Sequence, residues 1–426
     1  MELQTAKGVR DLPPEEKILK NKVVGTITKI FELYGFAPLE TPTLERYETL
    51  AAKYGAGAES DALKETFTLE DQGERKLGLK FEMTTSLARY VAQNPTIKMP
   101  FKVYQAGSVF RDGPIKSGRE REFWQCDVDT IGTASMLAEA EQISLLSDIF
   151  RQLKFRFVIK INNRKLVNGI LLQSGITEKQ KEALIAIDKL DKIGKAGVSE
   201  ELKRLGLNKA QINRLMDFLS SKYTFASLSK KITATEGNEG VNELKELFGY
   251  LKTLGVKETE FDLSLVRGQA YYSGTVIEAY LKDSVVTSSI AGGGRYDNMI
   301  RGLKGENGQE IPAVGVSFGI TPIMEQMKVQ NKMEQKTLAK VLIVPINAVA
   351  EALKVARELR ENCISTDFAL GKKGVSKNLE YANVLKIPYV IIIGEEEVKK
   401  KKILLKEMSS GTEQLLSVKD AVKKLS

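Results

Sequence analysis

Two strand-like runs, residues 101–112 and 120–132, lie on either side of a short polar loop that contains Gly113, Pro114 and Gly118. Glycine and proline are the residues that turns need, so the two runs predict an antiparallel hairpin. Successive side chains of a strand point to opposite faces. Positions 121, 123, 125, 127 and 129 therefore share one face, and we expect an antiparallel platform against which the rest of the chain folds.

Charge is concentrated on this hairpin. Three arginines and five carboxylates lie within residues 109–129: Arg111, Arg119, Arg121, Asp112, Glu120, Glu122, Asp127 and Asp129. One interpretation is a solvated hairpin with cross-strand ion pairs, which contribute little to stability. The other is a platform whose arginines hold a triphosphate, with Gln125 and Asp129 further along it. The spacing alone leaves both open.

The 426-residue chain contains no histidine. This excludes a Ser-His-Asp triad, an imidazole general base and a His-ligated zinc site. Its two cysteines, Cys126 and Cys363, are not spaced as a metal or redox motif. We therefore expect no protein-ligated zinc. The chemistry has to come from arginine, lysine, carboxylates, tyrosine, backbone groups and Mg²⁺, which suit phosphate chemistry run by positioning and charge stabilisation.

Changes between strand-like and helix-like sequence patterns predict the domain boundaries. Residues 165–255 read as successive helices between two sets of strands, and we interpret them as a helical insertion. The catalytic core then comprises residues 1–164 and 256–328, and residues 329–338 form a linker. Residues 339–426 alternate strand and helix, which indicates a small α/β domain with a mainly parallel sheet. Strands are also expected over 261–266, 270–281 and 285–297 of the core.

The net charge of +9 suits a polyanionic partner. Residues 336–426 hold 17 basic and 11 acidic residues, a net charge of +6, so most of the surplus lies in the tail. No apolar run is long enough to span a membrane, and the first residues are too polar for a signal peptide. We expect a soluble, cytoplasmic protein.

Three short segments hold further candidate site residues. "LKFEMTTSLARY" places Glu82 and Thr84 just before a helix, where an N-cap is the plainer interpretation. "LVRGQAYYSGTV" sets Arg267 beside a glycine and a tyrosine pair. "AGGGRYD" lets the backbone approach something closely, although a triple glycine is more often a tight strand crossing than a ligand cradle.

Together these segments resemble the histidyl-tRNA synthetases, a family of class II aminoacyl-tRNA synthetases. "YGFAPLETPTLE" resembles class II motif 1, "FRDGPIKSGREREFWQCDVD" motif 2 and "AVGVSFGI" motif 3. "LVRGQAYYSGTV" and "AGGGRYDNM" resemble the two peptides specific to the histidine enzymes, and "AIDKLDKIG" a piece of their insertion domain. "NLEYANVLKIPYVIIIGEEE" and "KILLKEMSSGTEQ" resemble their anticodon-binding domain. The resemblance runs from Gly8 to the C-terminus.

The resemblance implies an α+β catalytic core on an antiparallel sheet, with a C-terminal α/β anticodon-binding domain. It implies activation of L-histidine by ATP with Mg²⁺, transfer to histidine tRNA, and a homodimer with Pro42 in its interface. Arg111 and Arg267 would act on the α-phosphate, with Arg119 on the ATP tail and Gly294 beside the nucleotide. The substrate-binding residues would be Glu82, Thr84, Gln125, Asp129, Tyr271, Tyr272 and Tyr296.

The chain departs from the family pattern at three points. Pro322 takes the place of the motif 3 arginine that clamps the γ-phosphate, Gln269-Ala270 replaces a Leu-Asp pair, and Lys80 replaces an arginine. These changes leave an alternative: a catalytically weakened paralogue that binds histidine or tRNA as a regulatory protein. A generic basic RNA-binding protein does not explain the catalytic set.

Overall fold

The structure is a computed structural model that describes residues 3–52, 61–115, 120–220, 223–267, 271–304, 310–330, 336–371 and 374–426. The described chain divides into two compact units. One comprises Met1–Arg10 and Val23–Gln326, and the other Asp11–Lys22 and Met327–Ser426. Within the described residues, no helix combines the length and the apolar character that crossing a membrane requires.

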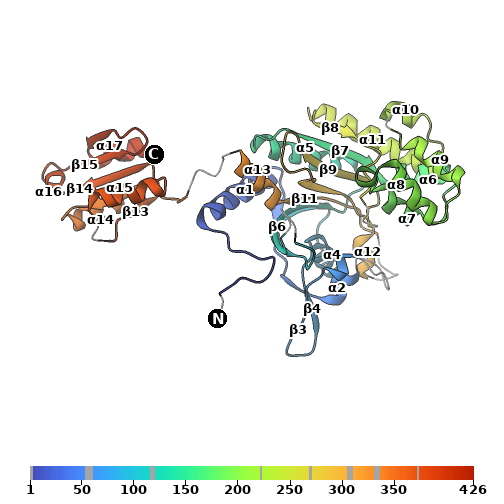
Figure 1. The fold of residues 1–426 in the computed structure, drawn as a ribbon, viewed down its shortest axis with the longest axis horizontal. Helices are drawn as coiled ribbons and strands as arrows, with labels where there is room; N and C mark the ends of the chain where they lie inside the picture. Colours follow the sequence, from blue (N-terminus) through green and yellow to red (C-terminus); the bar gives the residue numbers. More distant parts are fainter. Residues whose placement is uncertain are drawn as a thin grey trace. The chain divides into compact units, whose positions relative to one another are not determined.

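An eight-stranded sheet organises the first unit (Figure 1). Its order is β1 (Ala37–Pro38), β5 (Phe101–Phe110), β6 (Glu122–Ile131), β11 (Ala313–Gly319), β10 (Ala291–Arg295), β9 (Thr275–Leu281), β7 (Phe157–Asn163) and β8 (Thr259–Phe261). The six central strands pair antiparallel, and β1 and β8 join the edges in parallel. The predicted hairpin is β5–β6, so the expected antiparallel platform is confirmed.

Helices cover both faces of this sheet. On one face Phe318 of β11 contacts Phe31 of α1 (Pro14–Leu33) and Phe150 of α5 (Met136–Gln152), with ring centroids 5.8 and 5.9 Å apart. On the other face α4 (Thr84–Gln93) and α12 (Met299–Lys304) pack in one cluster with Ile131. Because Ile131 shares a face with residues 125, 127 and 129, that cluster covers only one end of the platform face.

A small sheet and further short helices complete the strand-rich part. The sheet has the order β2 (Leu44–Arg46), β4 (Lys76–Leu79) and β3 (Thr68–Glu70). The helices are α2 (Tyr47–Ala52), α3 (Asp61–Lys64) and α13 (Ile320–Val329). The Asp71 carboxylate accepts hydrogen bonds from the backbone N–H groups of Gly73 and Arg75 and so stabilises the turn between β3 and β4.

Helices are the only regular secondary structure in the described part of residues 164–253. They are α6 (Arg164–Gln173), α7 (Gln180–Ile187), α8 (Leu190–Arg204), α9 (Lys209–Phe218), α10 (Phe225–Ser229) and α11 (Thr235–Thr253). The backbones of α6 and α11 nearly touch, because a Cβ on Gly169 would lie 2.4 Å from the Cα of Gly237. We refer to residues 164–253 as the helical segment.

The C-terminal part of the second unit has its own sheet, in the order β13 (Thr366–Phe368), β12 (Val341–Pro345), β14 (Tyr389–Ile393), β15 (Ile403–Glu407) and β16 (Glu413–Leu416). The first three strands are parallel, as expected, and the last two are antiparallel additions. Its helices are α14 (Val349–Glu361), α15 (Val375–Val384), α16 (Glu395–Lys399) and α17 (Val418–Leu425).

The predictions for three strands in the core need correction. Residues 262–266 are not a strand, because the Asp262 carboxylate accepts hydrogen bonds from the backbone and hydroxyl of Ser264, which closes a local turn instead. Among the described residues 271–281, the strand comprises Thr275–Leu281, and the strand expected over 285–297 is confined to Ala291–Arg295.

Candidate active site

Two adjoining cavities lie on the platform face of the large sheet. The empty volume is about 620 Å³ in the smaller and about 1320 Å³ in the larger, and part of it is open to solvent. Five residues line both: Arg111, Gln125, Arg267, Gly292 and Ser317. The smaller compartment is lined by carboxylates and tyrosines, and the larger by serines, glycines and the start of α13. Arg111 and Arg267 therefore lie at the junction between an acidic, aromatic compartment and a larger one.

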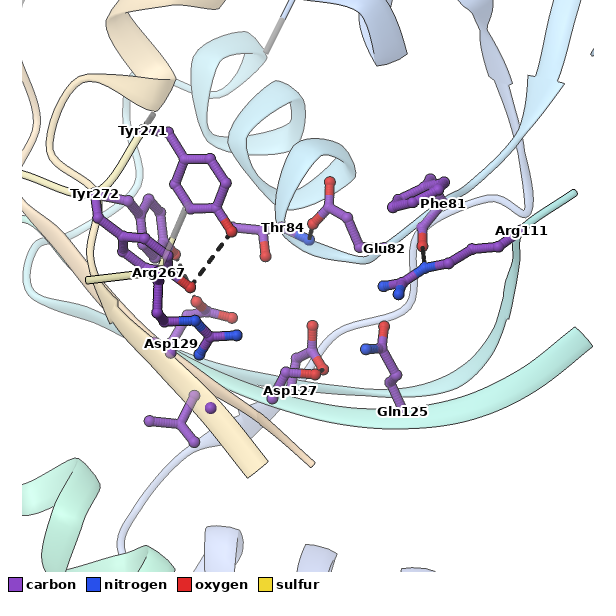
Figure 2. Close-up of a pocket in the computed structure, with 16 residues that line it drawn as sticks. Phe81, Glu82, Thr84, Arg111, Gln125, Asp127, Asp129, Arg267, Tyr271 and Tyr272 are labelled. Atoms are coloured by element: carbon purple, nitrogen blue, oxygen red, sulfur yellow. Dashed lines mark hydrogen bonds between the residues drawn. The ribbon is translucent and has the colours of Figure 1, made fainter. Parts of the chain in front are cut away.

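Arg111 is held between two aromatic rings. Its guanidinium carbon lies 4.4 Å from the ring centroid of Phe81 and 5.0 Å from that of Phe123. Its Nε donates a hydrogen bond of 3.4 Å to the carbonyl of Phe81. Stacking and the hydrogen bond restrict the side chain, which points into the smaller compartment (Figure 2).

Arg267 enters from the opposite side of the compartment (Figure 2). Its Nη1 donates to the carbonyl of Ile277 at 3.2 Å, and its Nε lies 3.5 Å from a carboxylate oxygen of Glu278. Its guanidinium carbon lies 5.5 Å from the ring centroid of Tyr272. Burial acts to lower the pKa of Arg267, but the charges of Tyr272 and Glu278 outweigh it and raise the pKa. The side chain therefore stays cationic.

Asp129 and three tyrosines form the inner end of the smaller compartment. The Tyr296 hydroxyl donates to Asp129 Oδ1 at 2.5 Å, and the hydroxyls of Tyr271 and Tyr272 are 3.4 Å apart. Burial raises the pKa of Asp129 well above its ordinary value, and the charge of Asp127 adds to the shift. Burial and the Asp129 charge likewise raise the pKa of Tyr296. A polar ring with N–H groups would complement this carboxylate–phenol set.

Glu82, Thr84 and Gln125 line the wall nearer Arg111. The Glu82 carboxylate accepts hydrogen bonds from the backbone N–H groups of Thr84 at 2.6 Å and Thr85 at 3.1 Å, at the start of α4. The N-cap residue itself is Met83, and Glu82, one residue before it, accepts from the first N–H groups of the helix while it also faces the compartment. The Oε1 of Gln125 is buried and has no hydrogen-bond partner in the described part of the chain. It is an acceptor open to a ligand donor.

The small residues of β11 leave space for the two compartments on the platform face. Gln125, Asp127 and Asp129 of β6 stand opposite Gly319, Ser317 and Gly315 of β11. A Cβ on Gly315 would lie 1.8 Å from Asp129 Oδ1, so only glycine fits there. The sequence prediction missed Asp127, Ser317, Phe81 and Phe123 as lining residues. The alternation counted along the hairpin already placed 123 and 127 on the site face.

Two predicted site residues are not part of this cluster. Arg119 falls outside the described residues. Gly294 does not line either compartment, because the Tyr272 ring covers it: a Cβ on Gly294 would lie 3.1 Å from that ring. Pro322 does line the larger compartment, together with Thr321. Among the described residues of that lining, the cations are Arg111 and Arg267, and both lie at the junction.

Comparison of the chain with known proteins identifies the family to which it belongs. The sequence profile "Histidyl-tRNA synthetase" matches residues 8–323, and "Anticodon binding domain" matches residues 340–426. Histidine–tRNA ligase 1 of Bacillus cereus is 42% identical over 428 residues, covering 99% of this chain and 97% of the relative. The chain belongs to the histidyl-tRNA synthetase family.

Other members of the family agree with this assignment. Histidine–tRNA ligase 2 of Shouchella clausii is 41% identical over 418 residues, covering 96% of this chain and 97% of the relative. The crystal structure of histidyl-tRNA synthetase from Nostoc sp. PCC 7120 superposes with a TM-score of 0.87 at 30% identity, over 100% of this chain and 99% of that one. The predicted fold class is thus confirmed: a synthetase core on a large, mainly antiparallel sheet, followed by an anticodon-binding domain.

Proposed function

We propose that this chain activates L-histidine with ATP to histidyl-adenylate and transfers the histidyl group to the 3′ end of histidine tRNA. The observation that carries the proposal is the junction of the two compartments. Arg111 and Arg267 line both, so an amino acid in the smaller compartment and a nucleotide in the larger one would meet at these two guanidiniums. The family uses ATP, and its sequence profile and relatives span the chain.

In the first step a carboxylate oxygen of histidine attacks the α-phosphorus in line. The bond from this phosphorus to the oxygen that bridges the α- and β-phosphates breaks, and pyrophosphate leaves. Negative charge on the α-phosphoryl oxygens would be stabilised by Arg111 and Arg267, which also bring two anions together. In the second step a ribose hydroxyl of the tRNA attacks the acyl carbon, and AMP leaves.

Recognition of histidine is assigned to the smaller compartment. Glu82, Thr84 and Gln125 would hold the α-amino group, since the unpartnered Gln125 Oε1 and the Glu82 carboxylate are acceptors. Asp129, Tyr271, Tyr272 and Tyr296 would read the imidazole. A site built to hydrogen-bond a ring N–H strongly rejects an analogue that lacks it, because its buried polar groups are then left unpaired.

Mg²⁺ fits the larger compartment as an ion that arrives with ATP. No group of three carboxylate or cysteine side chains that could hold a metal occurs among the described residues. Glu65 and Glu120 line the compartment, and Mg²⁺ is usually held by one or two carboxylates together with substrate phosphates. The bound ion would neutralise the β- and γ-oxygens. Arg119, across the hairpin loop, is proposed for the ATP tail.

ATP–pyrophosphate exchange tests the proposal. We expect exchange that depends on histidine and is at least about 10³-fold weaker with phenylalanine or glutamine, which lack the ring N–H pattern. The regulatory alternative predicts histidine binding without exchange. That result with correctly folded protein would refute the enzymatic assignment. The complete set of lining residues supports the enzyme, and we propose that the tail at 339–426 binds the tRNA.

We further propose a cytoplasmic C2 homodimer with the core at 1–164 and 256–328, the insertion at 165–255 and the linker at 329–338. Pro42 is exposed, and one face of the small sheet presents Leu44 and Leu69, which are 47% and 39% exposed. A second copy would cover this apolar face. Light scattering at micromolar concentration should give twice the chain mass, and Leu44→Glu combined with Leu69→Glu should weaken association. A monomeric parent would contradict the dimer.

A further inference from the structure

Arg164, the first residue of α6, is a buried cation whose hydrogen bonds go to the main chain around Arg267. Its side chain is 7% exposed, and none of the described carboxylates lies within ion-pair distance. Its Nη1 donates to the carbonyls of Val266 at 3.2 Å and Arg267 at 3.4 Å. Burial lowers its pKa, and the charge of Asp188 opposes the shift. Burying an arginine is costly without compensation, and these carbonyls supply it.

The backbone that receives these hydrogen bonds has an unusual conformation. Arg267 has φ of 49°, in the left-handed region that residues with a Cβ rarely adopt. Such a conformation persists only where its surroundings hold it. Asn162, on β7 just before α6, supports the same segment, because its side-chain amide donates to the carbonyls of Leu263 and Leu265 at 3.1 and 2.9 Å. The turn that carries Arg267 is thus held from the β7–α6 junction.

The guanidinium of Arg267 has little freedom to compensate for a shift of its backbone. Its Nη1 is bonded to the carbonyl of Ile277, and a Cβ on Gly292 would lie 2.2 Å from it. A displaced backbone would therefore move the guanidinium relative to Arg111. Misplacing a catalytic group by about 1 Å can cost on the order of 100-fold in rate.

α6 is itself anchored within the helical segment. The Asn163 side chain caps the helix by accepting from the backbone N–H of Lys165 at 2.9 Å, and its amide donates to Glu243 of α11 at 2.7 Å. One turn further on, Gly169 packs against Gly237 of α11. The start of α6 is therefore tied both to α11 and to the turn that carries Arg267.

We infer that Arg164 is a positioning residue: it holds the left-handed turn of Arg267 and so sets the Arg267 guanidinium for the reaction at the phosphate. The first helix of the helical segment then acts as part of the catalytic apparatus, and does more than interrupt the core. The inference rests on the proposed function, in which Arg267 stabilises the α-phosphate.

Arg164→Met tests the inference, with Lys165→Met as the matched control. Lys165 is the next residue of α6 and pairs with Glu243 at 2.6 Å, so its loss also removes a contact between α6 and α11. We expect Arg164→Met to lower kcat of histidine-dependent pyrophosphate exchange about 10- to 100-fold, while the histidine KM stays within about threefold. Lys165→Met should keep kcat within about threefold. Equal kcat in the two variants would overturn the inference.

A double-mutant cycle separates positioning from a general structural effect. If Arg164 acts through Arg267, Arg164→Met should cost nothing further in an Arg267→Ala background, whereas a structural defect should lower the residual rate again. Multiplicative losses would overturn the inference. Arg164→Lys should recover part of kcat, because an ammonium can still donate to a carbonyl. If Arg164→Met does not fold, Arg164→Lys carries the same cycle, and its loss of kcat must disappear without Arg267.

Failure of the proposed function is separable from failure of this inference. If the parent shows no histidine-dependent exchange, the proposed function fails. If the parent is active and both Arg164 variants match Lys165→Met, the function stands and the positioning role of Arg164 does not.

Discussion

Asp129 is a carboxylate whose surroundings work against its charge. It is 3% exposed, burial raises its pKa, the Asp127 charge raises it further, and the hydrogen bond from Tyr296 only partly offsets these effects. A group whose pKa is higher in the folded than in the unfolded state contributes stability at low pH, and this contribution is lost as the pH rises through the folded pKa. At neutral pH and above, the buried carboxylate of Asp129 therefore lowers the stability of the fold.

Asp129→Asn should relieve that cost. The variant should gain stability relative to the parent as the pH is raised from 5 to 8, by up to about 1.4 kcal/mol per pH unit between the unfolded and folded pKa values. It should lose histidine binding at the same time. Urea denaturation at both pH values measures the first effect and calorimetric titration the second. The exposed Glu380→Gln is the control, and a stability difference independent of pH would contradict the argument.

Pro322 lies in the first turn of α13 and lines the larger compartment, where the family pattern has an arginine. A proline is tolerated in a first turn because its missing N–H has no helical partner there, so Pro322→Arg should not disturb the helix. A charge-assisted hydrogen bond is worth about 1.5–3 kcal/mol. The variant should lower the ATP KM by about one to two decades and leave the histidine KM within about threefold.

Arg119→Ala should have the opposite effect on ATP. If Arg119 replaces the motif 3 arginine, its loss should raise the ATP KM by about one to two decades, most strongly at low Mg²⁺, and much less in the Pro322→Arg background. The measurement is the ATP KM of the four proteins across a Mg²⁺ titration. A parent-like ATP KM in Arg119→Ala at every Mg²⁺ concentration would exclude Arg119 from this role.

At the scale of elements, β10 and β11 shape the site through the side chains they lack. Gly293 is pressed against β11, because its Cβ would lie 1.9 Å from the carbonyl of Gly315, whereas Gly292 faces the Arg267 guanidinium. The glycine run is thus a tight strand crossing and also a cradle for a catalytic side chain. The tight strand crossing is therefore present at Gly293, whereas the ligand cradle stays a prediction.

Gly292→Ala should separate the two roles. The added methyl would lie 2.2 Å from Arg267 Nη1. Because the clash is with a side chain and not with the backbone, the fold should survive while the methyl displaces the guanidinium from its hydrogen bond to Ile277. We expect the kcat of pyrophosphate exchange to fall about 10- to 100-fold with little change in melting temperature. Gly302→Ala is the control, because no atom of the described residues outside its own turn of α12 lies within 4 Å of its added Cβ. Equal kcat in the two variants would show that Gly292 does not position Arg267.

The alternation of side chains along a strand and the glycine and proline residues of turns predict those helices and strands that are determined by nearby residues. The hairpin β5–β6 and the helical segment follow from such local signals. Residues 262–266 do not, because the Asp262 side chain competes with strand pairing and alternation carries no record of it. The antiparallel strands β15 and β16 are additions to the mainly parallel sheet predicted for the tail, and their pairing with β14 depends on contacts across the tail.

At the scale of the whole molecule, the site likewise combines features that follow from local sequence with features that depend on long-range contacts. The face shared by Gln125, Asp127 and Asp129 follows from the period of one strand. The contact of Arg111 with Phe81 and the hydrogen bonds from Arg164 to the turn that carries Arg267 join segments far apart in the chain. No local pattern specifies such contacts. The resemblance supplied Arg267 as a candidate, but the reason why Arg267 is held is visible only in three dimensions.

The C-terminal part of the chain carries its own core. Two hydrophobic clusters lie on opposite faces of its sheet, and all their members fall within residues 339–425. Core residues of one cluster contact α14 and α17, whereas the other cluster packs on α15. A fragment of residues 336–426 should therefore fold alone, with a cooperative melt by circular dichroism. Removal of these residues should leave both compartments of the core intact.

Truncation to residues 1–335 tests whether the core alone forms the adenylate while the tail serves tRNA binding. Pyrophosphate exchange should stay within about threefold of the parent, because the residues lining both compartments all precede residue 323. The kcat/KM for tRNA charging should fall on the order of 100-fold, because the lost basic residues would contact tRNA phosphates and release counterions. The remaining charging should also depend less steeply on salt. Charging equal to that of the parent at the same salt would contradict the assignment of the tail to tRNA binding, and loss of exchange would show that the core needs the tail to hold its site.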